Sequence, residues 1–294
     1  MSNNKTRKGI ILAGGTGSRL FPITSACSKQ LLPVYDKPMI YYPLSTLMLA
    51  GIKEIMIIST IEDKKKFQDL LGDGSNFGIS LFYEHQEKPE GIAQAFLIGS
   101  NFINNSPVAL ILGDNIFYGK GLGKILRRTS KSNDSTIFAY QVSDPERYGV
   151  LTFTKNKRVL NIEEKPLKPK SSFAVTGIYF YDSTIVEKAN MIKPSERGEL
   201  EISDINLLYL KERNLKVELL GRGMAWLDTG TINSLHDAST FIKTLENRQG
   251  VKISCPEEIA WRNNWINDEK LKYLANQLTK SGYGNYLLSL MDFY

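Results

Sequence analysis

The first 140 residues alternate short runs of apolar, mostly β-branched residues with longer stretches of helical periodicity. The short runs predict strands over residues 9–12, 54–60, 80–84, 108–112 and 136–141. Helices are expected between them, over residues 38–50, 62–71, 92–102 and 122–129. This β-α-β order is typical of an α/β fold with a doubly wound, mostly parallel, Rossmann-like sheet.

The pattern changes between residues 148 and 181, where three strand-like segments are separated by turn residues or prolines. They cover residues 150–154, 158–163 and 175–181, and they predict an inserted antiparallel part that carries a second ligand. Further along we expect a helix over residues 204–213, a strand over 216–220 and an amphipathic helix over 231–247. Beyond Pro256 the sequence predicts a helical, aromatic-rich C-terminal tail that packs on the body or on a neighbouring subunit.

Composition places the chain among folded globular proteins. Its 294 residues are 42% hydrophobic and 23% charged, which argues against a disordered, collagen-like or coiled-coil protein. A chain of this length can bury a core without disulfides or a structural metal. The formal net charge of +6 favours anionic partners such as phosphates, although an excess of solvated lysine explains it equally well. Because the basic residues are spread along the chain, no nucleic-acid partner is expected.

The cysteines and the hydropathy of the chain indicate where in the cell the protein is expected. Cys27 and Cys255 are isolated, so they form neither a disulfide framework nor a metal knuckle, which fits a reducing cytoplasm. The apolar run at residues 10–13 is too short for a signal peptide, and no run of 18 apolar residues occurs. We therefore expect a cytoplasmic protein with no membrane partner.

The most informative segment is Leu12-Ala-Gly-Gly-Thr-Gly-Ser-Arg-Leu-Phe-Pro22, directly after the first predicted strand. Glycines 14, 15 and 17 allow sharp turns that present backbone N–H groups to a phosphate, and Arg19 can fork onto phosphate oxygens. The segment matches neither the dinucleotide fingerprint nor the P-loop, because position 20 is Leu and no Gly-Lys-Ser/Thr follows. On spacing alone, a tight turn without a ligand remains an alternative.

Three further residues extend this candidate phosphate site. Lys29 is a second cation that loop closure could bring onto the same polyphosphate, although a lone lysine is usually solvated. Asp114 lies at the carboxyl end of a predicted strand, where open α/β sheets bind ligands and where an aspartate can hold Mg²⁺. A turn or capping role is the alternative for Asp114. Asp228, between apolar residues and a turn, needs a partner, and a shared Mg²⁺ would satisfy both carboxylates.

The run Glu163-Glu-Lys-Pro166 is a candidate sugar-phosphate site. Lys165 could bind a phosphate monoester while Glu164 accepts sugar hydroxyls, and an exposed charge cluster is the alternative. Arg197 offers another phosphate-binding cation. Neither histidine has ligands at metal-binding spacing, and no Gly-x-Ser-x-Gly nucleophile motif occurs.

These motifs resemble those of sugar-nucleotide pyrophosphorylases, and the run from Ser28 to Gly51 resembles the glucose-1-phosphate thymidylyltransferase branch. The likeness continues nearly end to end, through Leu70-Leu-Gly-Asp-Gly74, Gly113-Asp-Asn-Ile-Phe-Tyr-Gly119, Asp144-Pro-Glu-Arg-Tyr-Gly149, Val175-Thr-Gly-Ile-Tyr-Phe-Tyr-Asp182, Trp226-Leu-Asp-Thr-Gly230 and Cys255-Pro-Glu-Glu258.

The resemblance implies a role for each site residue. The nucleotide would be bound by Gly14, Gly15, Thr16, Gly17, Arg19, Lys29, Gln86, Gly91 and Asp114, with Gln86 and Gly91 reading the thymine. The sugar phosphate would be bound by Asn115, Tyr148, Gly149, Glu164, Lys165, Val175, Tyr179 and Arg197. Arg19, Lys29 and Lys165 would be catalytic, and Asp114 and Asp228 would bind Mg²⁺.

The resemblance also implies the reaction and the assembly. dTTP and α-D-glucose 1-phosphate would give dTDP-glucose and pyrophosphate, and a dTDP-sugar would inhibit the enzyme from a second pocket. A homotetramer is implied. We expect a nucleotidyltransferase domain over residues 1–250 and a helical extension over 251–294 that packs on the body or on a neighbouring subunit. Within the domain, residues 1–145 would bind the nucleotide and residues 146–230 the sugar phosphate. Use of UTP, or a non-catalytic nucleotide-sensing role, remains an alternative, whereas a dinucleotide oxidoreductase is poorly supported by Leu20.

Overall fold

The computed structural model describes residues 6–156 and 158–292. The outer ends of the two predicted domains, residues 1–5 and 293–294, lie outside the described residues.

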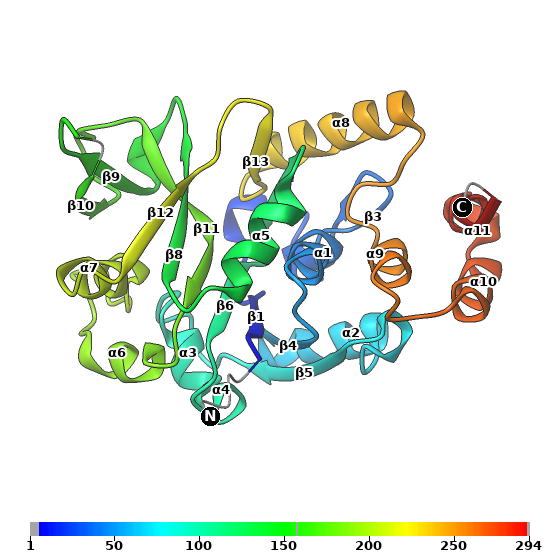
Figure 1. The fold of residues 1–294 in the computed structure, drawn as a ribbon, viewed down its shortest axis with the longest axis horizontal. Helices are drawn as coiled ribbons and strands as arrows, with labels where there is room; N and C mark the ends of the chain where they lie inside the picture. Colours follow the sequence, from blue (N-terminus) through cyan, green and yellow to red (C-terminus); the bar gives the residue numbers. More distant parts are fainter. Residues whose placement is uncertain (1–5, 157, 293–294) are drawn as a thin grey trace.

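Parallel strands form one half of a nine-stranded central sheet (Figure 1). Strand β1 (Lys8–Leu12) pairs in parallel with β4 (Glu54–Ser59) on one side and with β6 (Val108–Leu112) on the other. Strand β4 pairs in turn with β5 (Ser80–His85), also in parallel. These are the strands that the apolar runs predicted, and their carboxyl ends meet at one edge of the sheet.

The other half of the sheet is organised around β11 (Phe173–Tyr181), which runs antiparallel to β6. On its far side β11 pairs with β8 (Ser135–Gln141), and at its amino end it meets β9 (Gly149–Phe153). Strand β10 (Val159–Glu164) extends β9, and β12 (Leu215–Leu219) extends β8. Strands β8, β9 and β12 therefore run in the same direction as the parallel half of the sheet. Among the described strands of this sheet, only β10 and β11 run in the opposite direction. The predicted α/β fold with a mostly parallel sheet and an antiparallel insertion is therefore confirmed.

Two small sheets were not predicted. Strand β7 (Asn115–Gly119) pairs antiparallel with β13 (Met224–Asp228), and β2 (Pro33–Val34) forms a hairpin with β3 (Lys37–Pro38). The β7–β13 pair matters most, because its register sets Asp228 opposite Asn115.

Helices cover both faces of the sheet (Figure 1). One predicted helix, over residues 92–102, is divided at Gly99 into α3 (Gln94–Ile98) and α4 (Ser100–Ile103). A side chain at Gly99 would lie 3.1 Å from Ile10, so the break lets the chain pack closely on β1. The other helices are α1 (Tyr41–Leu49), α2 (Ile61–Leu71), α5 (Leu122–Lys131), α6 (Ile185–Met191), α7 (Ile202–Lys211), α8 (Ile232–Gln249), α9 (Pro256–Arg262), α10 (Asp268–Gln277) and α11 (Tyr283–Asp292).

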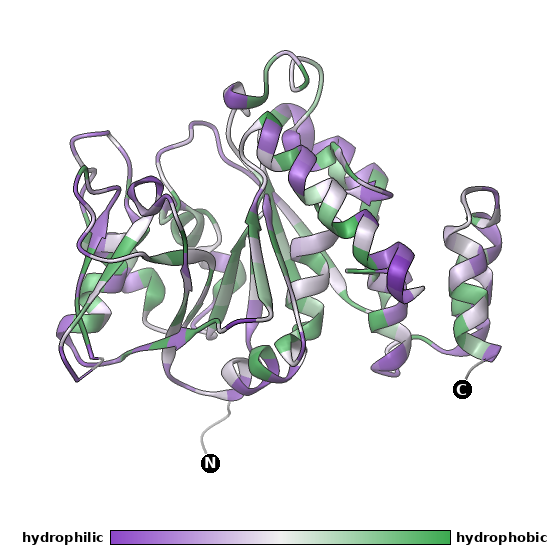
Figure 2. Ribbon diagram, turned by 90° about the horizontal axis from the view of Figure 1, so that it is seen from above, coloured by the Kyte–Doolittle hydropathy of each residue, from purple (hydrophilic) through white to green (hydrophobic). Residues whose placement is uncertain are grey.

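Successive side chains of the central strands point to opposite faces of the sheet, so the hydrophobic core has two layers. Ile10 and Ile11 of β1 are both fully buried but belong to different apolar clusters, one on each face of the sheet. Figure 2 shows the corresponding pattern of hydrophobic central strands and helices with hydrophilic outer faces. Leu271 and Leu287 of the C-terminal helices belong to the same cluster as Ala260 of α9. The division at residue 250 stays a prediction.

Among the described residues, no helix is both long enough and apolar enough to cross a membrane.

A buried arginine ties the start of β1 to its surroundings. The Arg7 guanidinium donates hydrogen bonds to the carbonyl oxygens of Val108 (3.0 Å), Tyr181 (2.6 Å), Ser130 (3.0 Å) and Ser132 (2.7 Å). These acceptors belong to β6, to β11, and to the end of α5 and the residue that follows it. One side chain thus joins the parallel half of the sheet to the inserted strand.

We predict that Arg7→Met lowers the free energy of unfolding by about 3 kcal/mol or more, because four carbonyl oxygens lose a charged donor while the side chain keeps its length. Urea denaturation would measure the change. Arg128→Met is the matched control, since Arg128 makes an exposed ion pair with Glu218 and its loss should cost less than about 1 kcal/mol. Equal effects of the two substitutions would contradict the proposed role of Arg7.

Candidate active site

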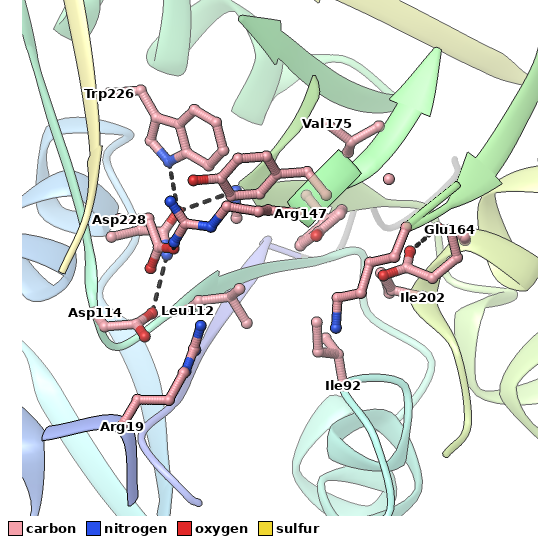
Figure 3. Close-up of a pocket in the computed structure, with 17 residues that line it drawn as sticks. Arg19, Ile92, Leu112, Asp114, Arg147, Glu164, Val175, Ile202, Trp226 and Asp228 are labelled. Carbon is pink, nitrogen blue, oxygen red and sulfur yellow. Dashed lines mark hydrogen bonds and ion pairs between the residues drawn. The ribbon is translucent and has the colours of Figure 1, made fainter. Parts of the chain in front are cut away.

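A pocket of about 210 Å³ opens where β6 and β9 diverge along β11 (Figure 3). Strand β11 meets β9 at Ala174 and joins β6 only from Ile178 onward. Ten of the residues expected at the site line this pocket: Arg19, Asp114, Asn115, Tyr148, Gly149, Glu164, Lys165, Val175, Tyr179 and Asp228. Residues from both halves of the chain therefore meet in one place.

Two aspartates in the lining of the pocket lie close enough to interact electrostatically. Asp114 follows β6, and Asp228 ends β13 opposite Asn115. Thr229 holds the backbone next to Asp228 against that of Asp114. Its hydroxyl and its backbone N–H both donate hydrogen bonds to the carbonyl oxygen of Asp114, at 2.8 and 3.1 Å. Figure 3 shows Asp114 and Asp228 on the same side of the pocket as Arg19.

The two carboxylates differ in their electrostatic environment. Burial would raise the pKa of Asp114, but the charge and hydrogen bond of Lys29 outweigh it and hold this pKa below its ordinary value. Burial raises the pKa of Asp228, and the negative charge of Asp114 raises it further, against the opposing effect of Lys29, Arg19 and Arg147. The nearby cations therefore outweigh burial at Asp114 but not at Asp228.

These two carboxylates suit a hard divalent cation. Among the described residues, no group of three or more acidic, histidine or cysteine side chains could hold a metal ion. Mg²⁺ is commonly bound by one or two carboxylates, with substrate phosphates and water completing its octahedral shell. Asp114 and Asp228 therefore fit Mg²⁺ bound together with a phosphorylated substrate.

Asn115 positions its neighbours. Its Oδ1 accepts hydrogen bonds from Trp226 Nε1 (2.5 Å) and from the Gly177 N–H (3.1 Å), and its Nδ2 donates to Asp114 (2.9 Å). The indole of Trp226 packs against the Tyr148 ring, with centroids 5.0 Å apart. Since the Asn115 oxygen already has two donors, its clearest role is to orient Asp114 and Trp226.

Glu164 and Lys165 are the charged candidate sugar-phosphate residues that line the pocket. Glu164 lies across the pocket from Asp114 and Arg19 in Figure 3, and its carboxylate accepts a hydrogen bond from Ser203 (2.5 Å). Lys165 has a left-handed backbone (φ 43°), and its N–H donates to the Tyr148 carbonyl oxygen at 3.0 Å. This bend at the end of β10 is uncommon for a residue with a side chain, and such strain is concentrated at functional sites.

The glycine-rich loop lies beside the pocket rather than in its lining. Gly15 and Gly17 have φ values of 96° and 61°, in the left-handed region that favours glycine. A side chain at Gly14 would lie 2.6 Å from Gln86 Oε1, so the loop packs directly on Gln86. The short helix that follows the loop carries Arg19 into the pocket.

Gln94 links Gln86 to Glu90, the residue that precedes Gly91. Gln86 donates to the Gln94 side-chain oxygen, which also accepts from the Glu90 N–H at 3.3 Å. Gly91 has φ 104°, and a Cβ there would lie 2.4 Å from the Leu200 carbonyl oxygen. Glycine is thus required at position 91 by close backbone packing, whether or not it contacts a base.

Arg197 does not line the pocket. Its guanidinium lies 2.8 Å from the Glu201 carboxylate and 3.1 Å from Glu199, and the nearest contact with Glu164 is 4.0 Å. Its role in gripping the sugar phosphate stays a prediction.

Sequence reasoning assigned no role to several lining residues, of which Arg147 is the only charged one. Arg147 Nη1 contacts Asp144 at 2.7 Å and Nη2 contacts Asp228 at 3.4 Å. Arg147 lies within residues 144–149, one of the runs that carry the family resemblance. No sequence spacing relates it to Asp228, which lies far along the chain. The others are Ile92, Leu112, Gly177, Ile202, Ser203 and Trp226.

A second pocket of about 310 Å³ lies between the start of α5 and the segment that follows α8. Gly119, Gly121 and Gly123 line one side of it, and Lys252 and Glu258 line the other. It shares no lining residue with the first pocket among those described.

Comparison with known proteins identifies the family. A nucleotidyl transferase family model matches residues 8–244. The chain is 59% identical to glucose-1-phosphate thymidylyltransferase of Neisseria meningitidis over 97% of its own length and 99% of that protein. It is 56% identical to the enzyme of the same name from Mycobacterium tuberculosis, with the same coverage of both chains.

Solved structures of similar fold belong to enzymes of the same kind. A structure described as a glucose-1-phosphate thymidylyltransferase from Bacillus anthracis, in complex with a sucrose, matches with TM-score 0.74 and 44% identity, over 80% of this chain and 95% of the other. A UDP-glucose pyrophosphorylase complexed with UDP-glucose matches with TM-score 0.70 and 25% identity, over 82% of this chain and 100% of the other. Nucleotidyltransferases generally use a divalent metal ion, in keeping with the aspartate pair. The chain therefore belongs to the nucleotidyl transferase family, as an enzyme of its glucose-1-phosphate thymidylyltransferase branch.

Proposed function

We propose that this enzyme transfers the thymidylyl group of dTTP to α-D-glucose 1-phosphate, giving dTDP-glucose and pyrophosphate. The observation that carries the proposal is the convergence of Arg19, Asp114, Lys165 and Asp228 on one pocket from four distant parts of the chain. A sugar-phosphate oxygen attacks the α-phosphorus of dTTP in line, and no covalent intermediate with the protein forms.

The chain's own residues reduce the repulsion between two anionic substrates. Lys165 binds the phosphate of glucose 1-phosphate, and Glu164 accepts hydrogen bonds from the sugar hydroxyls. Arg19 and Lys29 face the departing pyrophosphate and stabilise the negative charge that develops there. The attacking phosphate is already ionised near neutral pH, since its second pKa is about 6, so no general base is required.

Asp114 and Asp228 hold Mg²⁺ in this proposal, and the bound ion supplies charge neutralisation at the nucleotide phosphates. Gln86 and Gly91 contact the base, beside the glycine-rich loop that receives the triphosphate. The names of the 50–59% identical relatives favour dTTP over UTP. The neighbour described with UDP-glucose is only 25% identical.

Pyrophosphate release tests this function. Purified enzyme is assayed with dTTP or UTP, and with glucose 1-phosphate or other sugar 1-phosphates, with and without Mg²⁺. We expect the highest kcat/KM for dTTP with glucose 1-phosphate and no turnover without the metal. A preference for UTP would make the enzyme a uridylyltransferase, and the absence of release with every pair would favour a nucleotide-sensing protein.

We predict that Asp114→Asn and Asp228→Asn each lower kcat by about a hundredfold or more, because each removes a charged ligand of the metal. The fold should persist, since asparagine keeps the size of the side chain. Steady-state rates and thermal unfolding would measure both effects. Asp69→Asn, at an exposed ion pair with Lys65, is the control. Near-normal turnover in either active-site variant would refute the metal assignment.

The second pocket is the candidate regulatory site, and a dTDP-sugar is its proposed ligand. Lys252 lines this pocket but is already paired with Asp36 and Glu246, so the proposal rests on the glycines of the opposite wall, which leave room for a nucleotide. The homotetramer implied by the family and the cytoplasmic location stay predictions, and sedimentation would test the assembly.

We predict that a dTDP-deoxysugar such as dTDP-rhamnose inhibits the enzyme and that Gly123→Met abolishes this inhibition without changing the uninhibited rate. A side chain at Gly123 has room at its base, with Arg127 Nη2 at 3.4 Å, and its outer atoms would narrow the pocket. Inhibition curves of both proteins provide the measurement. Equal inhibition of the two would place the ligand elsewhere.

A further inference from the structure

Arg147 is the charged residue of the active-site pocket that the proposed chemistry does not use. It ends the short helix Pro145–Arg147 and reaches into the pocket, with its guanidinium 5.3 Å above the Tyr148 ring. Its side chain is 37% exposed, so it faces the open part of the pocket rather than the core.

The two ion pairs of Arg147 are unequal. Nη1 lies 2.7 Å from the Asp144 carboxylate, whereas Nη2 lies 3.4 Å from Asp228. Asp144 is therefore the anchor and Asp228 the looser contact. The guanidinium can release Asp228 without leaving its anchor.

The contact between Arg147 and Asp228 compensates the negative charge of a buried carboxylate. Asp228 is largely buried, at 16% side-chain exposure, beside the negative Asp114. Lys29 is paired with Asp114, and among the described residues Arg147 is the one cation within 4 Å of the Asp228 carboxylate. A divalent cation bound to Asp228 would repel the guanidinium, since both are positive and compete for the same oxygen atoms.

If the Arg147 guanidinium leaves Asp228, the phosphate of the sugar substrate can become its new partner. Lys165 is the other cation on the pocket lining near Tyr148 and Glu164, because Arg197 is held by Glu199 and Glu201 outside it. A guanidinium binds phosphate oxygens through directed, charge-assisted hydrogen bonds.

Building on the proposed function, we propose that Arg147 is a displaceable counter-ion: it neutralises Asp228 in the free enzyme and turns to the phosphate of the sugar substrate once a divalent cation occupies the aspartate pair. Arg147 would thus touch substrate, in a role distinct from those of Arg19, Lys29 and Lys165.

The test starts with Mn²⁺ as a probe of the metal site, measured by electron paramagnetic resonance on the free enzyme without substrates. Arg147→Gln removes the competing charge, so Mn²⁺ should bind roughly two- to fivefold more tightly than to the wild type. Asp144→Asn removes the anchor and leaves the guanidinium to Asp228, so Mn²⁺ should bind more weakly. The opposite signs separate competition from general damage to the site.

Substrate kinetics form the second arm. Arg147→Gln should raise KM for glucose 1-phosphate about tenfold or more, with a smaller effect on KM for dTTP, because a charged contact to the sugar phosphate is lost. Arg147→Lys should recover part of this loss. Arg128→Gln, at an exposed ion pair on α5, should match the wild type in both arms.

Mn²⁺ binding to Arg147→Gln that is equal to or weaker than wild type would overturn the proposal, as would an unchanged KM for glucose 1-phosphate. Failure of the proposed function is distinguishable, because it would appear as absent pyrophosphate release in the wild type. The Mn²⁺ measurement needs no substrate and is independent of that result.

Discussion

The repulsion between Asp114 and Asp228 is the constraint on which the rest of the site depends. Two carboxylates held together out of water are costly unless cations lie close to both. The chain brings Lys29 to Asp114 and Arg147 to Asp228, from segments far apart in sequence. The same negative charge that makes the pair costly in the free enzyme makes it a good ligand for a divalent ion.

The scaffold keeps this pair together through backbone contacts. The β7–β13 register and the hydrogen bond from the Thr229 N–H to the Asp114 carbonyl oxygen join main-chain atoms, and the Thr229 hydroxyl adds a second donor to the same oxygen, so the backbones of the two aspartates are held together. Asn115 then fixes the side-chain direction by joining Asp114 to Trp226 and to the backbone of β11. A change in β11 would therefore reach the aspartate pair through a single amide.

Local pattern was enough to predict the parallel strands and most helices, because their apolar periodicity is a property of contiguous residues. It could not reveal the β7–β13 pair, since this pairing joins segments that are far apart in the chain. The helix over residues 92–102 looked continuous because packing of Gly99 against β1 is a tertiary effect. The pairing of Asp114 with Asp228 was expected only from a shared metal and from family resemblance, and the role of Arg147 had no local signal.

Comparison of the two arginines near the sugar-phosphate wall shows how pairing decides which cation is available. Arg197 contacts both oxygens of Glu201 and is also close to Glu199, so its charge is strongly compensated before any substrate arrives. Arg147 has one firm carboxylate contact, and its second partner is a carboxylate suited to a metal ion. Binding of a divalent ion would therefore leave Arg197 as it is but increase the uncompensated charge on Arg147. Metal binding would thereby make the pocket more attractive to a phosphate just when the aspartate pair is neutralised, which couples the order of binding to the charge of the site.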